Sequence, residues 1–281
     1  MVLKMKLQKK KDKANQGVRT TLFVILDGFG IADFEHPGNA ITPETAPHIF
    51  SYMNAYPSSL LKAHGKDVGL FPGQAGNSEA GHLNIGAGRV VKQDVVMISE
   101  AIKNGTFFKN EVFNQASLHV KKHKSRVHVM GLLTDGQSAH AHPDHLYALL
   151  TLFRKKGVKD VFLHLFTDGR DSTPHSAIGF LSKLRAYMRN GEKIASVTGR
   201  FYGMDRNKLW DRTERAYQAL VDGKGFEAVS AEEAIESAYN RGESDEYIQP
   251  TVIAEKGEPV AKIQDNDVVI FFNARSDRAR Q

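Results

Sequence analysis

The chain of 281 residues contains no cysteine. This absence excludes a disulfide framework, a zinc site built from thiolates and a catalytic thiol. No apolar run approaches the roughly 18 residues that a membrane-spanning helix needs, and the N-terminus lacks the apolar core of a secretion signal. Hydrophobic residues make up 41% of the sequence and charged residues 25%. This composition is typical of a globular protein with one large core or two modest ones.

Positive charge is concentrated at the N-terminus. Residues 1–13 contain six lysines and one aspartate, so most of the formal charge of +6 belongs to this short segment. A block of like charges is typical of a solvated segment, and we expect residues 1–20 to form a basic, disordered tail. Attraction of this tail to nucleic acid or to a membrane is the less favoured interpretation.

Asp27 directly follows the first strand that the sequence predicts. Residues 21–26 are apolar and partly β-branched, which indicates a buried strand. In an open α/β sheet, ligands bind at the carboxyl ends of strands, so Asp27 is a candidate functional residue. An aspartate at this position is also a common turn former, and the local pattern leaves both interpretations open. Further along, the sequence predicts a helix over 44–55 and a short strand over 59–65.

Ser78 lies in a glycine-rich stretch just ahead of another predicted helix. Glycines allow the backbone to approach a ligand, and a helix start offers free N–H groups to an anion. A serine hydroxyl needs a base or a metal to become a nucleophile. Residues 76–80 do not form a Gly-x-Ser-x-Gly elbow, so a Ser–His–Asp triad is not the first choice. The alternatives are a metal-activated nucleophile, with Asp27 as partner, or a simple helix cap.

Helical and strand patterns alternate from about residue 90 onward, which predicts parallel βαβ units. The sequence therefore favours an α/β fold with a mainly parallel sheet. The predicted helices cover residues 94–104, 110–124, 143–156, 174–190, 211–222 and 231–241, and the predicted strands cover 126–133, 159–166, 193–198 and 267–272.

The loops that follow these four strands are rich in arginine, aspartate and histidine. Parallel strands bring such loops to one edge of the sheet, and guanidinium groups suit carboxylate and phosphate. The sequence therefore predicts a site for a small anion, with surface ion pairing as the structural alternative. Lysines are not part of the cluster, which disfavours nucleic acid. The candidate residues are His140, Arg170, Asp171, Arg200, Arg206, Arg275 and Arg278.

Two of these residues are candidates for proton transfer. Asp171, beside Arg170, is suited to accept or return a substrate hydroxyl proton, and His140 is suited to the same task near neutral pH. His140 and His142 also have the spacing of a metal-ligand pair, but an arginine-rich edge repels cations. We therefore expect His140 to bind substrate and His142 to have a structural role.

The motifs at 26–30, 76–89, 168–171, 199–206 and 273–278 together resemble those of cofactor-independent (2,3-bisphosphoglycerate-independent) phosphoglycerate mutases, in the alkaline phosphatase superfamily. The resemblance implies two domains. Residues 21–92 would form the N-terminal part of a phosphatase-like metal domain. Residues 93–281 would form an inserted α/β phosphotransferase domain that binds the substrate.

The resemblance also implies an activity, which is the interconversion of 3-phosphoglycerate and 2-phosphoglycerate in glycolysis and gluconeogenesis. Asp27 and Ser78 would ligate one of two divalent metal ions, usually Mn²⁺, and Ser78 would be transiently phosphorylated without 2,3-bisphosphoglycerate. The seven candidates from His140 to Arg278 match substrate-binding positions. A cytoplasmic enzyme is implied, monomeric at full length, with no nucleic-acid or membrane partner.

The sequence departs from this family in two places. The loop at 136–142 is longer than the usual one, so either His140 or His142 could face the substrate. The chain also ends at Gln281, ahead of the remaining metal ligands, and we expect these 281 residues alone to be inactive unless a C-terminal chain complements them. The alternatives are another metal-dependent phosphatase or phosphomutase of the superfamily, or a fragment that only binds anions.

Overall fold

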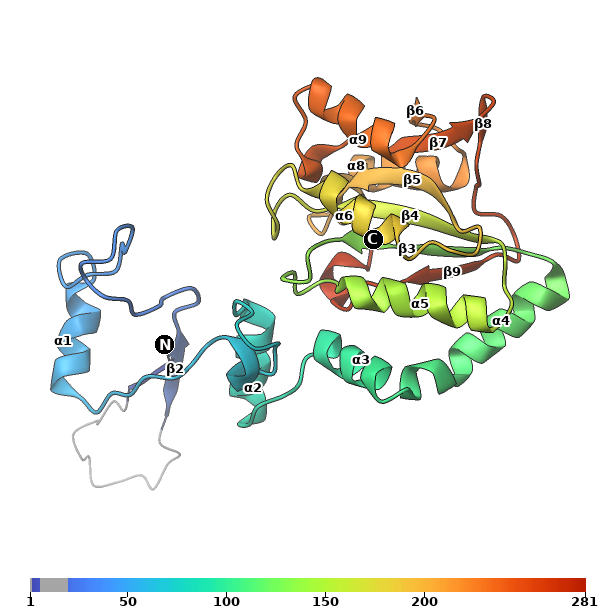
Figure 1. The fold of residues 1–281 in the computed structure, drawn as a ribbon. Coiled ribbons are helices and arrows are strands. Elements are labelled where there is room, and N and C mark those ends of the chain that lie inside the picture. Colours follow the sequence, from blue (N-terminus) through green and yellow to red (C-terminus); the bar gives the residue numbers. More distant parts are fainter. Residues whose placement is uncertain (1, 6–19) are drawn as a thin grey trace. The chain divides into compact units, whose positions relative to one another are not determined.

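The computed structural model describes residues 2–5 and 20–281 (Figure 1). Contacts between Cα atoms divide the chain into two units, Met1–Val91 and Lys92–Gln281. None of the described helices is both long and apolar enough to cross a membrane. The α/β class predicted from the sequence is confirmed, because helices and strands alternate along the second unit.

The first unit contains a two-stranded antiparallel sheet of β1 (Val2–Met5) and β2 (Leu22–Ile25), and the helices α1 (Pro47–Ala55) and α2 (Ser78–Ala87). β2 confirms the strand predicted over 21–26, but the burial predicted for it is wrong, because Leu22, Phe23 and Val24 are 52%, 45% and 38% exposed. Within the segment expected to be a disordered tail, residues 2–5 form β1, whose pairing with β2 gives the backbone groups of both strands hydrogen-bond partners. The rest of that prediction falls on residues 6–19, outside those that the structure describes.

The short strand predicted over 59–65 is wrong. Residues 57–63 have no regular structure, and a 3₁₀ turn covers Gly65–Val68. Leu60 and Leu61, whose apolar side chains suggested a strand, are 73% and 75% exposed. Among the described residues no strand lies beside this segment to pair with it. An extended segment without a partner strand cannot form the backbone hydrogen bonds of a sheet.

The second unit is organised around one sheet with the strand order β6-β7-β5-β4-β3-β9, to which β8 adds beside β7. The four predicted strands are present and mutually parallel, as β5-β4-β3-β9. β7 runs antiparallel to β5 and parallel to β6, so the sheet is mainly parallel, as predicted. The strands are β3 (Val127–Leu133), β4 (Val161–Thr167), β5 (Lys193–Gly199), β6 (Phe226–Ala228), β7 (Thr251–Glu255), β8 (Glu258–Pro259) and β9 (Val268–Phe271).

Helices pack on this sheet, and in Figure 1 α6 and α9 lie together on one face. The predicted helices are all present with small shifts of their ends, but the predicted helix over 174–190 is shorter. It begins at Ala177 because the Asp245 carboxylate accepts the N–H groups of Ser176 and Ala177. The helices are α3 (Asp94–Lys103), α4 (Glu111–His123), α5 (Pro143–Lys155), α6 (Ala177–Arg185), α7 (Arg200–Gly203), α8 (Trp210–Val221) and α9 (Ala231–Asn240).

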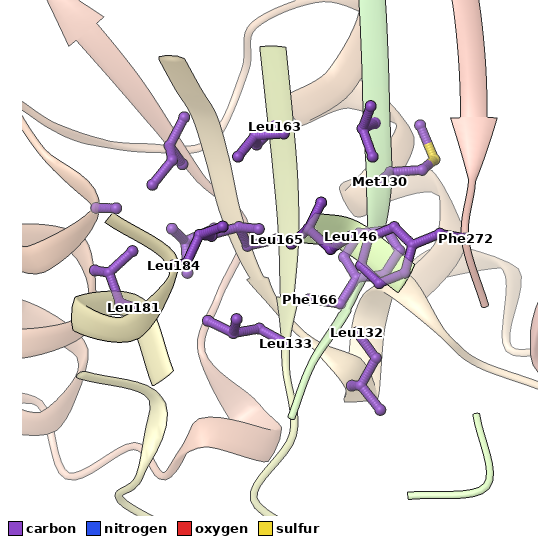
Figure 2. Close-up of a cluster of buried hydrophobic side chains, with 14 of the residues drawn as sticks. Met130, Leu132, Leu133, Leu146, Leu163, Leu165, Phe166, Leu181, Leu184 and Phe272 are labelled. Atoms are coloured by element: carbon purple, nitrogen blue, oxygen red, sulfur yellow. The ribbon is translucent and has the colours of Figure 1, made fainter. Parts of the chain in front are cut away.

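The core of the second unit lies between the parallel strands and their helices (Figure 2). β3 is buried along its whole length, as expected for a strand with both faces covered. Leu146 on α5, Leu165 on β4 and Leu181 on α6 are each 1% exposed and belong to this core. Burying each such side chain stabilises the fold by about 1.5–3 kcal/mol. The carboxyl ends of the parallel strands are thus held on a rigid support.

Candidate functional site

In the first unit, Ser78 and Asp27 are in direct contact. Asp27 follows β2, and the Ser78 hydroxyl donates a hydrogen bond of 2.7 Å to Asp27 Oδ2. Ser78 is the first residue of α2, but Asn77 caps the helix, since its Oδ1 accepts the N–H of Ala80 at 3.0 Å. The interpretation of Ser78 as the helix cap is therefore wrong. Its hydroxyl binds the carboxylate that sequence reasoning paired with it.

His82 is a neighbour of Ser78 that sequence reasoning did not assign. One turn further along α2, its Nδ1 lies 2.8 Å from the Ser78 carbonyl oxygen and 3.1 Å from Ser78 Oγ. A carbonyl only accepts, so we assign the ring hydrogen to Nδ1, which then cannot accept the Ser78 proton. His82 is therefore not placed as the base of Ser78. The i, i+4 spacing on a helix is the signal that could have predicted this contact.

In the second unit, the loops after β3, β4, β5 and β9 converge at one edge of the sheet, as the sequence predicts. Arg200 opens α7 at the end of β5 and is only 2% exposed. Its Nη1 donates to Asp168 Oδ1 at 2.5 Å and to Asp171 Oδ2 at 2.9 Å. Burial by itself would lower the pKa of Arg200, but the two carboxylates raise it. Arg200 is thus a buried cation held by two carboxylates from the β4 loop.

Asp171 is held from two sides. Besides Arg200, the Ser138 hydroxyl of the β3 loop donates to Asp171 Oδ2 at 2.6 Å. Burial works to raise the pKa of Asp171, but the hydrogen bonds from Arg200 and Ser138 and the charge of Arg200 outweigh it, so this pKa is lowered. The Asp171 side chain is 31% exposed and carries a negative charge at neutral pH. It can accept a proton from a bound hydroxyl.

His140 lies at the same edge, in the loop after β3, and is 5% exposed. Burial is the main cause that lowers its pKa to about 4, with Arg200 and Arg275 adding to the effect. The predicted proton transfer by His140 near neutral pH is therefore not favoured, because an imidazole with so low a pKa is a weak base and carries no proton to donate there. Its Nδ1 is buried without a hydrogen-bond partner among the described residues, so it can bind a ligand group.

His142 has a different position from His140. It is the N-cap of α5, and its Nδ1 accepts the backbone N–H of Asp144 at 3.3 Å. This contact is in line with the structural role expected for His142. His140 is tied to the β9 loop instead, because its carbonyl accepts the N–H of Ala274 at 2.6 Å. Of the two histidines, His140 is the one that borders the arginines.

The remaining arginines come from the loops after β5 and β9. Arg206 Nη1 and Arg275 Nη2 both donate to Asp277 Oδ2, at 2.8 Å and 3.0 Å. Arg278 donates to the carbonyl oxygen of Met204 at 2.8 Å. Burial, followed by the charges of Arg200, Arg206 and Arg170, lowers the pKa of Arg278 to about 10. A group of neighbouring cations, one of them partly buried, is suited to an anionic ligand.

Arg170 is more exposed than the other arginines, with 55% of its side chain accessible. Its Nη1 lies 3.3 Å from Glu246 Oε1. The structural alternative, surface ion pairing, agrees with the carboxylate contacts of Arg170, Arg206 and Arg275 but not with Arg200, whose ion pair is buried. It does not account for Arg278, whose hydrogen bond goes to a backbone oxygen.

Sequence reasoning missed the carboxylates and the hydroxyl that hold these side chains. Asp168 is buried between Arg200 and its own loop, where its Oδ1 also accepts the N–H of Asp171 at 3.1 Å. Asp277 joins Arg206 to Arg275, and Glu246 comes from a segment that the sequence did not connect with the site. Asp168 lies at a strand end, which is a signal that could have predicted its role.

Two of the described residues, Asp27 and Ser78, lie where the sequence predicts a metal site. Among residues 2–5 and 20–281 there is no group of three or more His, Cys, Asp or Glu side chains that could hold a metal ion. Asp27 and Ser78 contribute one carboxylate and one hydroxyl, which are the oxygen ligands that Mn²⁺ and Mg²⁺ prefer. The two residues therefore fit part of a site for a hard divalent cation.

Comparison with known proteins gives concordant results. Residues 98–281 match the family model described as "BPG-independent PGAM N-terminus". Over 266 residues the chain is 50% identical to the 2,3-bisphosphoglycerate-independent phosphoglycerate mutase of Clostridium acetobutylicum, covering 94% of this chain and 52% of that protein. It is 52% identical over 266 residues to the protein of the same name from Chloroflexus aggregans, covering 94% of this chain and 49% of that protein.

A solved structure is also similar. It is described as that of Leishmania mexicana phosphoglycerate mutase at low cobalt concentration, and it superposes with a TM-score of 0.77 at 31% identity. The match covers 83% of this chain and 45% of the Leishmania chain. The chain thus spans about half the length of the curated relatives that it matches.

Proposed function

This chain belongs to the BPG-independent phosphoglycerate mutase family, and we propose that it forms part of an enzyme that interconverts 3-phosphoglycerate and 2-phosphoglycerate. The observation that carries the proposal is the group of arginines at the carboxyl edge of the sheet, with Arg278 crowded by Arg200, Arg206 and Arg170. Phosphoglycerates carry both a phosphate and a carboxylate, and both groups accept paired hydrogen bonds from guanidinium.

The arginines have the task of holding the glycerate while its phosphoryl group is transferred. Arg206, Arg275 and Arg278 bind the anionic groups, and an anion there lowers the mutual repulsion that acts on Arg278. His140, which is neutral, offers a ring nitrogen to a substrate hydroxyl or carboxylate. Retaining the glycerate between the two transfers is what makes the reaction an isomerisation rather than a hydrolysis.

Ser78 is the nucleophile of this proposal. Its oxygen attacks phosphorus, the bond between phosphorus and the glycerate oxygen breaks, the proton of the Ser78 hydroxyl passes to the released glycerate oxygen, and Ser78 becomes phosphorylated. The glycerate then reorients, and its other hydroxyl attacks the phosphoserine while Asp171 accepts the proton of that hydroxyl, which returns to the Ser78 oxygen when the bond between phosphorus and that oxygen breaks. Asp27 fixes the Ser78 hydroxyl, as their hydrogen bond of 2.7 Å indicates. Water must be kept from the phosphoserine, or the enzyme would act as a phosphatase.

Two divalent metal ions, Mn²⁺ by preference, complete the proposed centre, and Asp27 and Ser78 would hold one of them. Such an ion would lower the pKa of the bound hydroxyl and stabilise charge on the transferring phosphoryl group. We propose that the other ligands lie in the half of the relatives' length that this chain does not cover. The glycolytic role, the cytoplasmic location and the monomeric state stay predictions.

The decisive experiment measures mutase activity in a polypeptide with the length of the relatives, with Mn²⁺ and without 2,3-bisphosphoglycerate. We expect turnover of 3-phosphoglycerate, phosphoserine at residue 78 by mass spectrometry after rapid quenching, and loss of both in Ser78→Ala. The 281-residue chain alone should bind 3-phosphoglycerate without turning it over. Hydrolysis of simple phosphate esters without mutase activity would instead identify a phosphatase.

A further inference from the structure

Ser138 is the buried hydroxyl that, together with Arg200, holds Asp171 at the candidate site. It lies in the loop between β3 and α5 and is 1% exposed. Its Oγ accepts the backbone N–H of His140 at 3.1 Å and donates to Asp171 Oδ2 at 2.6 Å. One side chain thus connects two residues that belong to the proposed substrate site.

The direction of these two hydrogen bonds is fixed by their chemistry. A hydroxyl has a single proton, and a backbone N–H can only donate. Because the His140 N–H points at Ser138 Oγ, the hydroxyl proton is the one that faces Asp171. Arg200 Nη1 donates to the same carboxylate oxygen at 2.9 Å. Asp171 Oδ2 therefore accepts two hydrogen bonds, which holds it as an unprotonated oxygen.

The other oxygen of Asp171 is in a different situation. Among the described residues no side-chain or backbone hydrogen bond reaches Asp171 Oδ1, and the side chain is 31% exposed. With Oδ2 engaged by Ser138 and Arg200, Oδ1 is the oxygen available to a substrate hydroxyl. The rotation of the carboxylate, and so the direction in which Oδ1 points, depends on both donors.

We propose that Ser138 is a positioning residue, which orients Asp171 so that Oδ1 accepts the proton of the attacking glycerate hydroxyl. This inference depends on the proposed mutase reaction for its functional part. Its structural part, the control of the Asp171 carboxylate by the Ser138 hydroxyl, can be measured without any substrate.

A purely local role is the competing explanation for Ser138. A serine that accepts the N–H two residues ahead stabilises a turn, and this requires nothing of Asp171. In that case removal of the hydroxyl would disturb the loop but leave the titration of Asp171 unchanged. The titration of this carboxyl group therefore separates the two explanations.

The experiment compares Ser138→Ala with two other variants. Ser138→Thr keeps the hydroxyl, and Ser117→Ala is a matched control, because Ser117 is also a buried serine and donates to the Phe113 carbonyl oxygen within α4. The carboxyl carbon of Asp171 is followed by NMR during an acid titration of each full chain. We expect the midpoint in Ser138→Ala to rise by about one pH unit, with wild-type values in the other two variants.

The same variants are then assayed for 3-phosphoglycerate turnover in the polypeptide that has mutase activity. We expect kcat of Ser138→Ala to fall by about tenfold, with a smaller change in KM. A rate change of this size corresponds to the free energy of one hydrogen bond to a charged group. The acid limb of its pH profile should move to higher pH, and Ser138→Thr should restore both. If Ser138→Ala does not fold, Ser138→Cys, with a weaker donor, takes its place.

The outcomes distinguish the two claims. An unchanged Asp171 titration, or a kcat unaffected by loss of the hydroxyl, overturns the role of Ser138 even if the protein is a mutase. A shifted titration in a protein without mutase activity overturns the proposed function and limits Ser138 to holding the carboxylate.

Discussion

Arg200 and Asp168 form a buried ion pair in which Nη1 lies 2.5 Å from Oδ1, with side-chain exposures of 2% and 0%. A charge in such a place is tolerated only with a partner, and removing one partner leaves the other uncompensated. The pair joins the end of β5 to the loop after β4. Asp171 is the second acceptor of the same guanidinium nitrogen. The arrangement of the candidate site thus depends on a residue that sequence reasoning did not select.

Removal of the Asp168 charge should be costly. We expect Asp168→Asn to lower the free energy of unfolding by about 3–5 kcal/mol, because the Arg200 guanidinium stays buried without one of its counter-charges. Urea denaturation followed by circular dichroism measures the change. Asp222→Asn is the matched control, since Asp222 pairs with Lys224 at the surface and should cost at most about 1 kcal/mol. A similar loss of unfolding free energy in both variants would show that the buried pair of Arg200 and Asp168 does not stabilise the fold more than a surface pair does.

Loss of Arg278 should weaken anion binding. We expect Arg278→Met to reduce the affinity for 3-phosphoglycerate by about tenfold or more, because a charge-assisted hydrogen bond to the ligand is lost. Arg278→Lys should recover part of the affinity, since lysine keeps the charge without the planar fork. Calorimetric titration provides the measurement. Lys193→Met, which removes a surface cation paired with Glu255, should bind 3-phosphoglycerate as tightly as the wild type does. An equal loss of affinity in both variants would show that net positive charge, and not Arg278 itself, attracts the ligand.

The stability of the second unit should rise with pH in the mildly acid range. The pKa values of His140 and His145 are lowered to about 4, chiefly by burial, whereas an unfolded histidine titrates near 6.5. Between about pH 4 and 6.5 the unfolded chain therefore binds more protons than the folded chain, so folding is opposed as the pH falls. Each histidine should cost on the order of 2 kcal/mol at pH 5 relative to pH 7.

A variant tests this pH dependence directly. His145→Gln should reduce the difference in unfolding free energy between pH 5 and pH 7, because one proton-binding group is removed from the unfolded state. His123→Gln, at an exposed position of α4, is the control and should leave the difference nearly unchanged. Urea denaturation at the two pH values measures this difference in unfolding free energy. If the difference is the same in the wild type and in His145→Gln, burial of His145 is not its cause.

At the start of α2, Asn77 has a structural role and Ser78 is the catalytic candidate. We expect Asn77→Ala to lower the free energy of unfolding by about 1 kcal/mol, because the cap on the Ala80 N–H is lost. Ser78→Ala should cost less stability, since its hydroxyl contacts Asp27 and not a free N–H group of the helix. Thermal unfolding of both variants measures this order. The opposite order would restore Ser78 to the role of a cap.

The sequence predicted the parallel strands of the second unit but not its antiparallel edge. β3, β4 and β5 carry runs of apolar residues that require burial on both faces, and such runs are visible in any single sequence. β7 spans Thr251–Glu255 and β6 only three residues, so their patterns are too short to be distinguished from loops. β7 forms a strand because β5 offers it an unpaired edge, and β6 then pairs with the outer edge of β7.

The sequence also predicted which residues belong to the candidate site and that they lie at strand ends. It did not predict what these residues contact. Arginines that follow parallel strands must meet at one edge of the sheet, and His140, Arg200 and Arg278 do so. The sequence could not predict that Arg200 is buried, since burial depends on what packs over it. Nor could it predict that Asn77, and not Ser78, caps α2, because both residue types are suited to this position.

The sequence by itself determined the fold class, the parallel strands and the side chains available for chemistry, because hydrophobic periodicity and strand-end placement are local properties. The tertiary structure alone decided the protonation state and the direction of each hydrogen bond. His140 is neutral and Asp171 charged because of what surrounds them after folding. Ser138 turns its proton toward Asp171 because the His140 N–H occupies its other side. Such properties come from residues far apart in the sequence, and only the folded chain brings them together.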